Sequence, residues 1–171
     1  MILAFQILAL AAVALFLVRW QMGLRKRNAQ SWESLLARLQ HEGCVHDLNE
    51  KFLWKDGLSV TPEDAWQRME GPKGLWIMYQ NARVMQEMAD FALRNDPQVD
   101  LLLVETLRSD AVQIRLCVLM ALTQYGFTQA SEGVRVYAFR TAALYSGMAA
   151  RMTQLLQSHY AGVLPDFIEA M

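Results

Sequence analysis

Residues 41–47 hold the densest group of side chains that could do chemistry in this chain of 171 residues. The segment contains two of the three histidines, His41 and His46, and one of the two cysteines, Cys44. Imidazole and thiolate groups are ligands of zinc and other transition metals. The spacing His-x-x-Cys-x-His could bring two or three of these side chains together, as in a zinc site or an axial ligand of a tetrapyrrole.

The rest of the chain gives this group little support as a metal site. Standard zinc patterns need a second pair of ligands at a fixed spacing, and the other candidates, Cys117 and His159, lie far along the chain. A histidine is also favoured near the C-terminus of a helix by the helix dipole. We therefore predict a solvated helix end and no cofactor, and keep a tethered metal- or cofactor-binding protein as the alternative.

Catalytic motifs are absent from the sequence. There is no nucleophile elbow, Walker A loop, dinucleotide-binding glycine pattern or His-Glu-x-x-His motif. The carboxylates Glu63, Asp64 and Glu70 are explained by helix ends or solvent exposure. We expect a protein that is not an enzyme, and infer no small-molecule substrate.

The first residues are unusually apolar. Between Ile2 and Val18 the only polar residue is Gln6, and every charged residue lies at Arg19 or later. Seventeen helical residues span about 26 Å, and Trp20 with a snorkelling Arg19 can extend the span towards the roughly 30 Å of a bilayer core. A cleaved signal peptide and a buried helix are less favoured. A signal peptide has positive residues before its apolar stretch and a small-residue cleavage site after it, and this segment has neither. Residues 1–22 are therefore predicted to be a transmembrane anchor.

Basic residues follow the anchor directly. The span is followed by four basic residues, Arg19, Arg25, Lys26 and Arg27, and no basic residue precedes it. The positive-inside rule therefore predicts that the N-terminus lies outside and the rest of the chain in the cytoplasm. We expect the membrane to be a bacterial inner membrane. The collar, residues 23–30, is suited to anionic membrane lipid. Without these four bases the chain keeps 12 basic and 17 acidic residues, which gives no electrostatic footprint for nucleic acid.

Residues 31–171 are predicted to form a compact, irregular all-α bundle of about five to six helices. Apolar residues recur at spacings of three and four, beginning with the stripe Trp32, Leu35, Leu36 and Leu39. Start and stop signals place one helix from Pro62 to about Gly71, one ending at Asn95, and one over residues 131–160.

Residues 99–126 are predicted to be two antiparallel helices joined at Ser109 and Asp110. The positions that carry a resemblance to a known repeat are Ile114, Arg115, Val118, Ala121, Leu122, Tyr125 and Gly126. They make this segment similar to a single HEAT-type hairpin, which implies a protein-binding scaffold without catalysis. No second copy follows at the roughly 40-residue period of such arrays, and an ordinary hairpin in an irregular bundle is the favoured alternative.

Two groups of residues could face partners instead of the core. Met78, Met85 and Met88 follow the apolar stripe of their helix, so we predict core, with an adaptable binding groove as the alternative. A second group, Phe52, Leu53 and Trp54 between two lysines, is predicted to be a loop pinned to a core, or else to touch lipid headgroups.

A single anchor with one Gln and no charge is not a transport path. We therefore expect a non-catalytic accessory, assembly or scaffold subunit of a larger membrane protein complex of respiratory, photosynthetic, secretion or division type. Its partners would be membrane lipid and other subunits of that complex, with the cytoplasmic domain binding protein neighbours.

Overall fold

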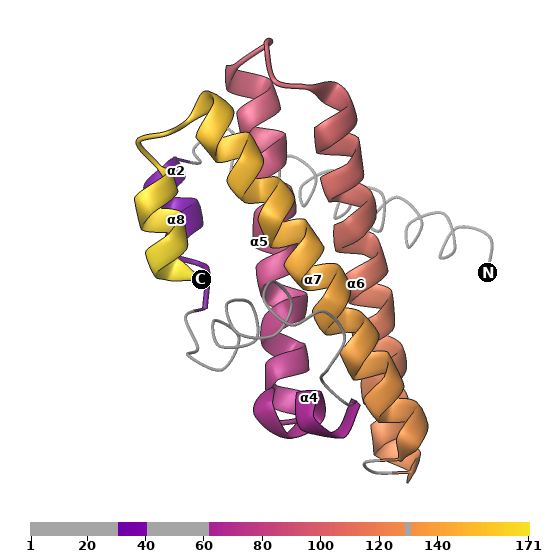
Figure 1. Ribbon diagram of the computed structural model, residues 1–171. Coiled ribbons are helices and arrows are strands. Elements are labelled where there is room, and N and C mark those ends of the chain that lie inside the picture. Colours follow the sequence, from indigo (N-terminus) through magenta and orange to yellow (C-terminus); the bar gives the residue numbers. More distant parts are fainter. Residues whose placement is uncertain (1–30, 41–61, 129–130) are drawn as a thin grey trace, which may run out of the picture. The chain divides into compact units, whose positions relative to one another are not determined.

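A computed structural model describes residues 31–40, 62–128 and 131–171 of the chain. These residues contain six helices and no strand, which confirms the all-α class (Figure 1). The helices are α2 (Trp32–Leu36), α4 (Pro62–Arg68), α5 (Pro72–Asn95), α6 (Leu101–Thr128), α7 (Glu132–His159) and α8 (Leu164–Ala170).

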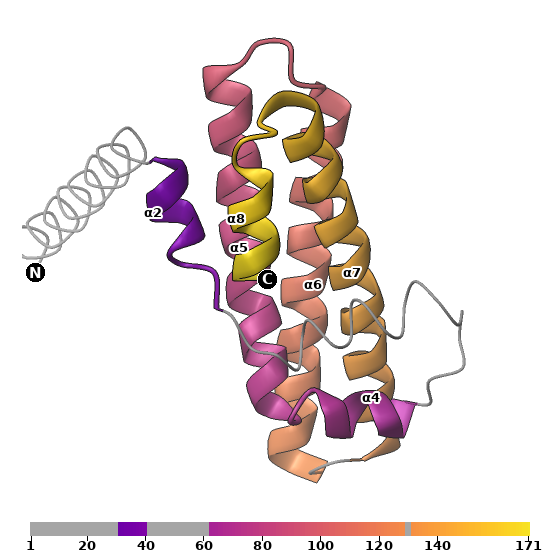
Figure 2. The ribbon, with the colours of Figure 1, turned by 60° about the vertical axis from the view of Figure 1, so that its left-hand side comes forward.

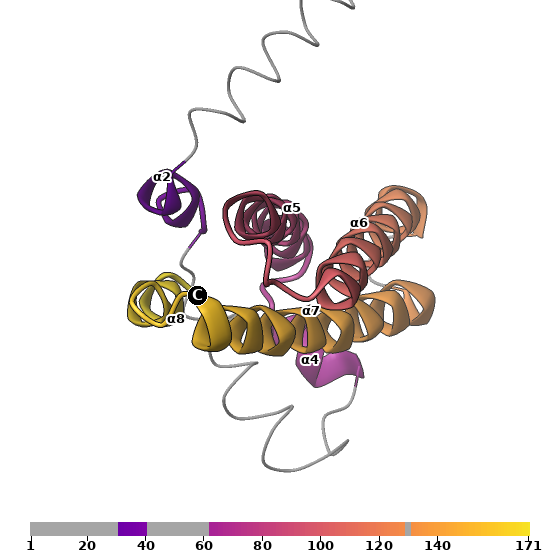
Figure 3. The same cartoon turned by 90° about the horizontal axis from the view of Figure 1, so that it is seen from above.

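The three long helices α5, α6 and α7 pack on one another side by side (Figures 1 and 3). Only five residues separate α5 from α6, and three separate α6 from α7, so successive helices run antiparallel. Helix α4 packs on α7, and α8 contacts both α2 and α7 (Figure 2).

The core lies between the long helices. Helix α6 turns a stripe of small and branched side chains inward, and the alanines in it let neighbouring helices approach closely. Burying one Leu- or Met-sized side chain stabilises a fold by about 1.5–3 kcal/mol. The inward stripe of α6 consists of Val104, Leu107, Ala111, Ile114, Val118 and Ala121.

Most of the methionines on the described helices are buried in the core. The predicted core positions Met78, Met85 and Met88 of α5 are buried, which confirms the interpretation as core. The same is true of Met69, Met148 and Met152, whereas Met120 of α6 is exposed. Because methionine adapts to irregular gaps, these side chains suit a bundle whose helices differ in length and angle.

Helix boundaries around α4 and α5 follow the sequence signals. Pro62 begins α4 and Pro72 begins α5, and the chain turns between them through Glu70 and Gly71, both with positive φ. A Cβ atom at Gly74 would overlap the carbonyl oxygen of Met69. The predicted stop near Gly71, the end at Asn95 and the helix after Ser131 are confirmed.

The predicted hairpin in residues 99–126 is wrong, because α6 is one continuous helix from Leu101 to Thr128. Its start is capped by Asp100, whose Oδ1 accepts a hydrogen bond from the Leu102 N–H at 2.8 Å. Ser109 lies inside the helix, and Asp110 is buried and bonded to Arg151 of α7 at 2.6 Å. Residues 101–125 contain no Pro or Gly that would interrupt the helix. Because the HEAT-type resemblance required a hairpin in this segment, it is wrong as well.

The predicted anchor, residues 1–22, and the basic collar, residues 23–30, lie outside the described residues. Among the helices that the structure does describe, none is long and apolar enough to cross a membrane.

Candidate interaction surface

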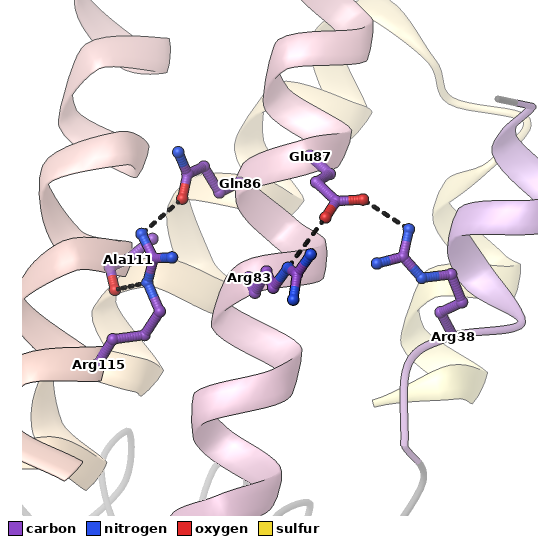
Figure 4. A network of polar contacts seen from close by, with 6 residues as sticks. All are labelled: Arg38, Arg83, Gln86, Glu87, Ala111 and Arg115. Carbon is purple, nitrogen blue, oxygen red and sulfur yellow. Dashed lines mark hydrogen bonds and ion pairs between the residues drawn. The ribbon is translucent and has the colours of Figure 1, made fainter. Parts of the chain in front are cut away.

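A row of charged side chains crosses the solvent side of α5 (Figure 4). Glu87 lies in the centre and accepts hydrogen bonds from Arg38 at 2.5 Å and from Arg83 at 3.2 Å. On the other side of α5, Arg115 of α6 donates hydrogen bonds to the Gln86 side chain at 2.9 Å and to the carbonyl oxygen of Ala111, one turn earlier in α6, at 3.0 Å. The row therefore joins the residues after α2 to α5, and α5 to α6.

This row is suited to holding helices together and not to acid–base chemistry. Burial raises the pKa of the Glu87 carboxyl, but the hydrogen bonds and charges of Arg38 and Arg83 lower it more, so the pKa lies below its ordinary value. A general base that works near neutral pH needs a pKa closer to the operating pH. Glu87 is therefore ionised at pH 7 and fixed by its two arginines.

A buried polar cluster lies around Asn81. Its side chain accepts a hydrogen bond from the Gln40 N–H at 2.9 Å and donates to the Gln40 carbonyl at 3.2 Å and to Tyr145 Oη at 3.1 Å. The hydroxyl of Tyr145 donates in turn to the sulfur of Met171 at 3.4 Å. Burial raises the pKa of Tyr145 far above its ordinary value, against a smaller opposing effect of Asn81, so the phenol stays protonated.

The histidine and cysteine group predicted as a possible ligand set, His41, Cys44 and His46, lies outside the described residues. Within the described part of the chain, no three His, Cys, Asp or Glu side chains are grouped so that they could hold a metal ion. His159 contacts Asp96, with 3.0 Å between Nδ1 and Oδ2. The backbone N–H of Gln98 has the largest effect and lowers the pKa of Asp96; burial opposes it, and the contact with His159 lowers the pKa further.

The predicted membrane-contact residues likewise fall outside the described ranges, so the structure does not test them. They are Arg19, Trp20, Arg25, Lys26, Arg27, Phe52, Leu53 and Trp54.

The side of α6 that faces away from the bundle is exposed and largely apolar. We call this surface the outer face of α6. In Figures 1 and 3 no described helix covers this side, because α5 and α7 both pack on the inward stripe. The outer face consists of Leu102, Glu105, Ser109, Val112, Leu116, Leu119, Thr123 and Gly126, with Met120 and Phe127 beside them, all exposed.

Charge is almost absent from the outer face. Its only charged residue is Glu105, which forms an ion pair with Arg108 one turn away. Between Val112 and Phe127 the single charged residue is Arg115, and its guanidinium is bonded to α5. Large exposed apolar surfaces on proteins mark interaction sites, so this face is the strongest candidate site among the described residues.

Sequence reasoning missed the outer face because it divided α6 at Ser109. A helix predicted in two halves has two short apolar stripes, each of which can be assigned to a core. One signal was available: the segment from residue 113 to residue 128 has a single charged residue, Arg115, and apolar residues on every side of the helix. A helix that is apolar all round is normally buried on all sides.

No protein-family model, curated protein or solved structure matches this chain.

Proposed function

We propose that this protein is a non-catalytic accessory, assembly or scaffold subunit of a larger membrane protein complex, which binds a protein neighbour through the outer face of α6. The observation that carries the proposal is the uncharged apolar surface formed by Val112, Leu116 and Leu119 with Phe127. Exposing such side chains to water is unfavourable by about 25 cal/mol per Å². A partner that covers them gains this free energy.

The polar clusters support a binding role for the bundle as a whole. The Glu87 row and the Asn81 cluster fix α2, α5, α6 and α7 relative to one another through side chains that are already bonded. A rigid support lowers the entropic cost of binding, because the bound shape exists before the partner arrives.

Photo-crosslinking in cells tests the proposal directly. A photoreactive amino acid placed at Leu119 of the full chain should crosslink to a protein neighbour on illumination. The matched control is the same amino acid at Gln154, an exposed residue of α7, which should give much less product. Equal crosslinking from both positions, or none from Leu119, would contradict the proposed binding surface.

Membrane attachment is a separate part of the proposal and has its own test. The full chain should stay in the membrane fraction after alkaline carbonate extraction, because an apolar segment of the length of residues 2–18 is held by lipid and not by surface charge. Release into the supernatant would exclude an integral anchor. The crosslinking result would be unaffected, so the two parts can fail independently.

A further inference from the structure

We propose that the neighbour bound at the outer face of α6 is a second copy of this chain, with the two α6 helices antiparallel. This inference depends on the proposed function, because it names the partner for the same surface. The evidence is that the face fits a second copy of itself in spacing, in shape and in charge.

The spacing of the outer face is that of a coiled coil. Its eight positions, from Leu102 to Gly126, follow one another at alternating intervals of three and four residues over nearly the whole helix. These are the intervals between the a and d positions of a heptad repeat; four of the eight positions hold Leu or Val, and the other four hold Glu105, Ser109, Thr123 and Gly126. In an antiparallel pair each a position faces a d position of the other helix, and this sequence then places Leu116 opposite the partner's Val112, and Ser109 opposite the partner's Leu119.

The ends of the helix are complementary in the same register. Leu102 is 74% exposed and lies opposite the partner's Gly126. A Cβ at Gly126 would have no atom within 4 Å, so no described contact within the chain requires glycine there. Glycine inside a helix is less favourable than alanine, because it loses more backbone freedom on folding. A leucine from a second helix would occupy the space that the missing side chain leaves.

Phe127 adds to this end contact. Its side chain is 86% exposed and lies one position beyond Gly126. In the antiparallel register it comes next to the partner's Leu102, which is exposed as well. The apolar C-terminal end of each α6 helix thereby covers the apolar N-terminal end of the partner's α6, so this contact occurs twice in the dimer.

Charge favours the antiparallel arrangement over a parallel one. A parallel pair would place Glu105 opposite the partner's Glu105, and like charges at such a contact are unfavourable. The antiparallel pair places Glu105 opposite the partner's Thr123. The two helix dipoles then point in opposite directions, and side by side they attract each other. A membrane surface is a poorer occupant, because helices that lie on membranes are rich in Lys or Arg on their polar side. Helix α6 has two basic residues, Arg108 and Arg115, and both are bonded to α5, at Asp90 and Gln86.

The size of the contact predicts its strength. Helix α6 has 28 residues, so its face is about 40 Å long and about 10 Å wide, or about 400 Å² per copy. Standard protein interfaces bury about 800 Å² per partner. We therefore expect a dimer that dissociates in the micromolar range, and association must be measured at tens of micromolar.

Disulfide crosslinking of the full chain in mild detergent tests the orientation. In a background with Cys44→Ser and Cys117→Ala, one chain carries Ser109→Cys and a second, of different mass, carries Leu119→Cys. Mixing them under oxidising conditions should give the mixed dimer. Neither chain alone should crosslink. In an antiparallel pair, residue 109 of one copy and residue 109 of the other lie ten residues apart along the helix axis, or about 15 Å, and the same holds for residue 119. This distance is beyond the roughly 7 Å between Cα atoms that a disulfide can bridge. Crosslinking of Ser109→Cys alone would show a parallel pair and overturn the proposal.

Sedimentation of the same full chain tests the surface itself. Leu116→Glu should weaken dimerisation about tenfold or more, since it places two carboxylates near the centre of an apolar contact. The control is Val136→Glu on the solvent side of α7, since Val136 and Leu116 are 50% and 51% exposed. Circular dichroism should show the same helix content for both variants.

The failure of the dimer and the failure of the proposed function give different results. A wild-type chain that is monomeric at tens of micromolar overturns the dimer. If the photoreactive group at Leu119 then links to a different protein, the proposed function stands with another partner. If it links to nothing, both fail. A crosslink from Leu119 to residues 41–61 of the same chain would also overturn the dimer, because the face would be covered internally.

Discussion

Asn81 joins three parts of the chain that are distant in sequence. Its buried amide bonds both backbone groups of Gln40 and the hydroxyl of Tyr145, so one side chain serves the segment after α2, α5 and α7. A buried polar group that loses its partner costs about 1–3 kcal/mol. The positions of α2 and α7 relative to α5 therefore depend on this residue more than on a typical core methyl group.

Asn81→Ala should lower the free energy of unfolding by about 2–4 kcal/mol, because it removes the partner of both backbone groups of Gln40 and the donor to the Tyr145 hydroxyl. Urea unfolding of the full chain in mild detergent, followed by tryptophan fluorescence, measures the change. The control is Gln80→Ala, which removes an exposed bond to the Gln40 side chain and should cost at most about 0.5 kcal/mol. Equal losses would show that the Asn81 bonds are not important for stability.

Glu87 should make stability dependent on pH. Its pKa in the folded protein is below the ordinary value, so the stabilisation that it gives is complete above the unfolded pKa of about 4.3 and is lost as the pH falls through the folded pKa. The difference in urea midpoint between wild type and Glu87→Gln should be constant above about pH 5 and should shrink towards pH 3. In an Arg38→Gln background the difference should be smaller at pH 7. A difference that grows on acidification would contradict the assignment.

At the scale of elements, the sequence predicted some helix boundaries well and one badly. Pro62 and Ser131 mark helix starts, and Asn95 marks an end, through backbone chemistry that acts within a few residues. Ser109 and Asp110 carry an equally local start signal, yet Asp110 is bonded to Arg151, 41 residues later. A helix-start signal of a few residues gives no information about a residue on another helix that binds the same side chain.

The same limit explains the candidate site. That Val104 and Leu107 face inward follows from periodicity, but which side of α6 remains uncovered depends on where α5 and α7 lie. An apolar residue such as Leu116 has the same appearance in sequence whether it is buried or exposed. The outer face therefore emerged only when the packing of three helices was known.

Substitutions at Asp100 and Ser109 should differ in sign. Asp100→Ala removes the cap of α6 and should destabilise the protein by about 1 kcal/mol. Ser109→Ala, inside the helix, should leave stability unchanged or raise it by up to about 0.5 kcal/mol, because alanine is the better helix former. Urea unfolding at low protein concentration checks both. A loss of about 1 kcal/mol at Ser109 would instead indicate a second helix start there.

At the scale of the whole molecule, the metal hypothesis for His41, Cys44 and His46 is open to a direct measurement. We expect the purified full chain to carry no stoichiometric metal or chromophore, since the sequence offers no second pair of ligands at zinc spacing. Elemental analysis and absorption spectra of the wild type and of a Cys44→Ala, His46→Ala variant should therefore agree. Stoichiometric metal in the wild type that the double substitution removes would favour the metal-binding alternative.

Met171 has a practical consequence for anyone who extends this chain. Its side chain is buried and accepts the hydrogen bond of Tyr145, and its backbone N–H closes the last turn of α8 on Phe167. An affinity tag or reporter joined directly after residue 171 therefore begins at a buried residue, and its first residues must pass from the protein core to the solvent. A flexible glycine-serine spacer is needed there, and without one a change in stability could be mistaken for an effect of the fused domain.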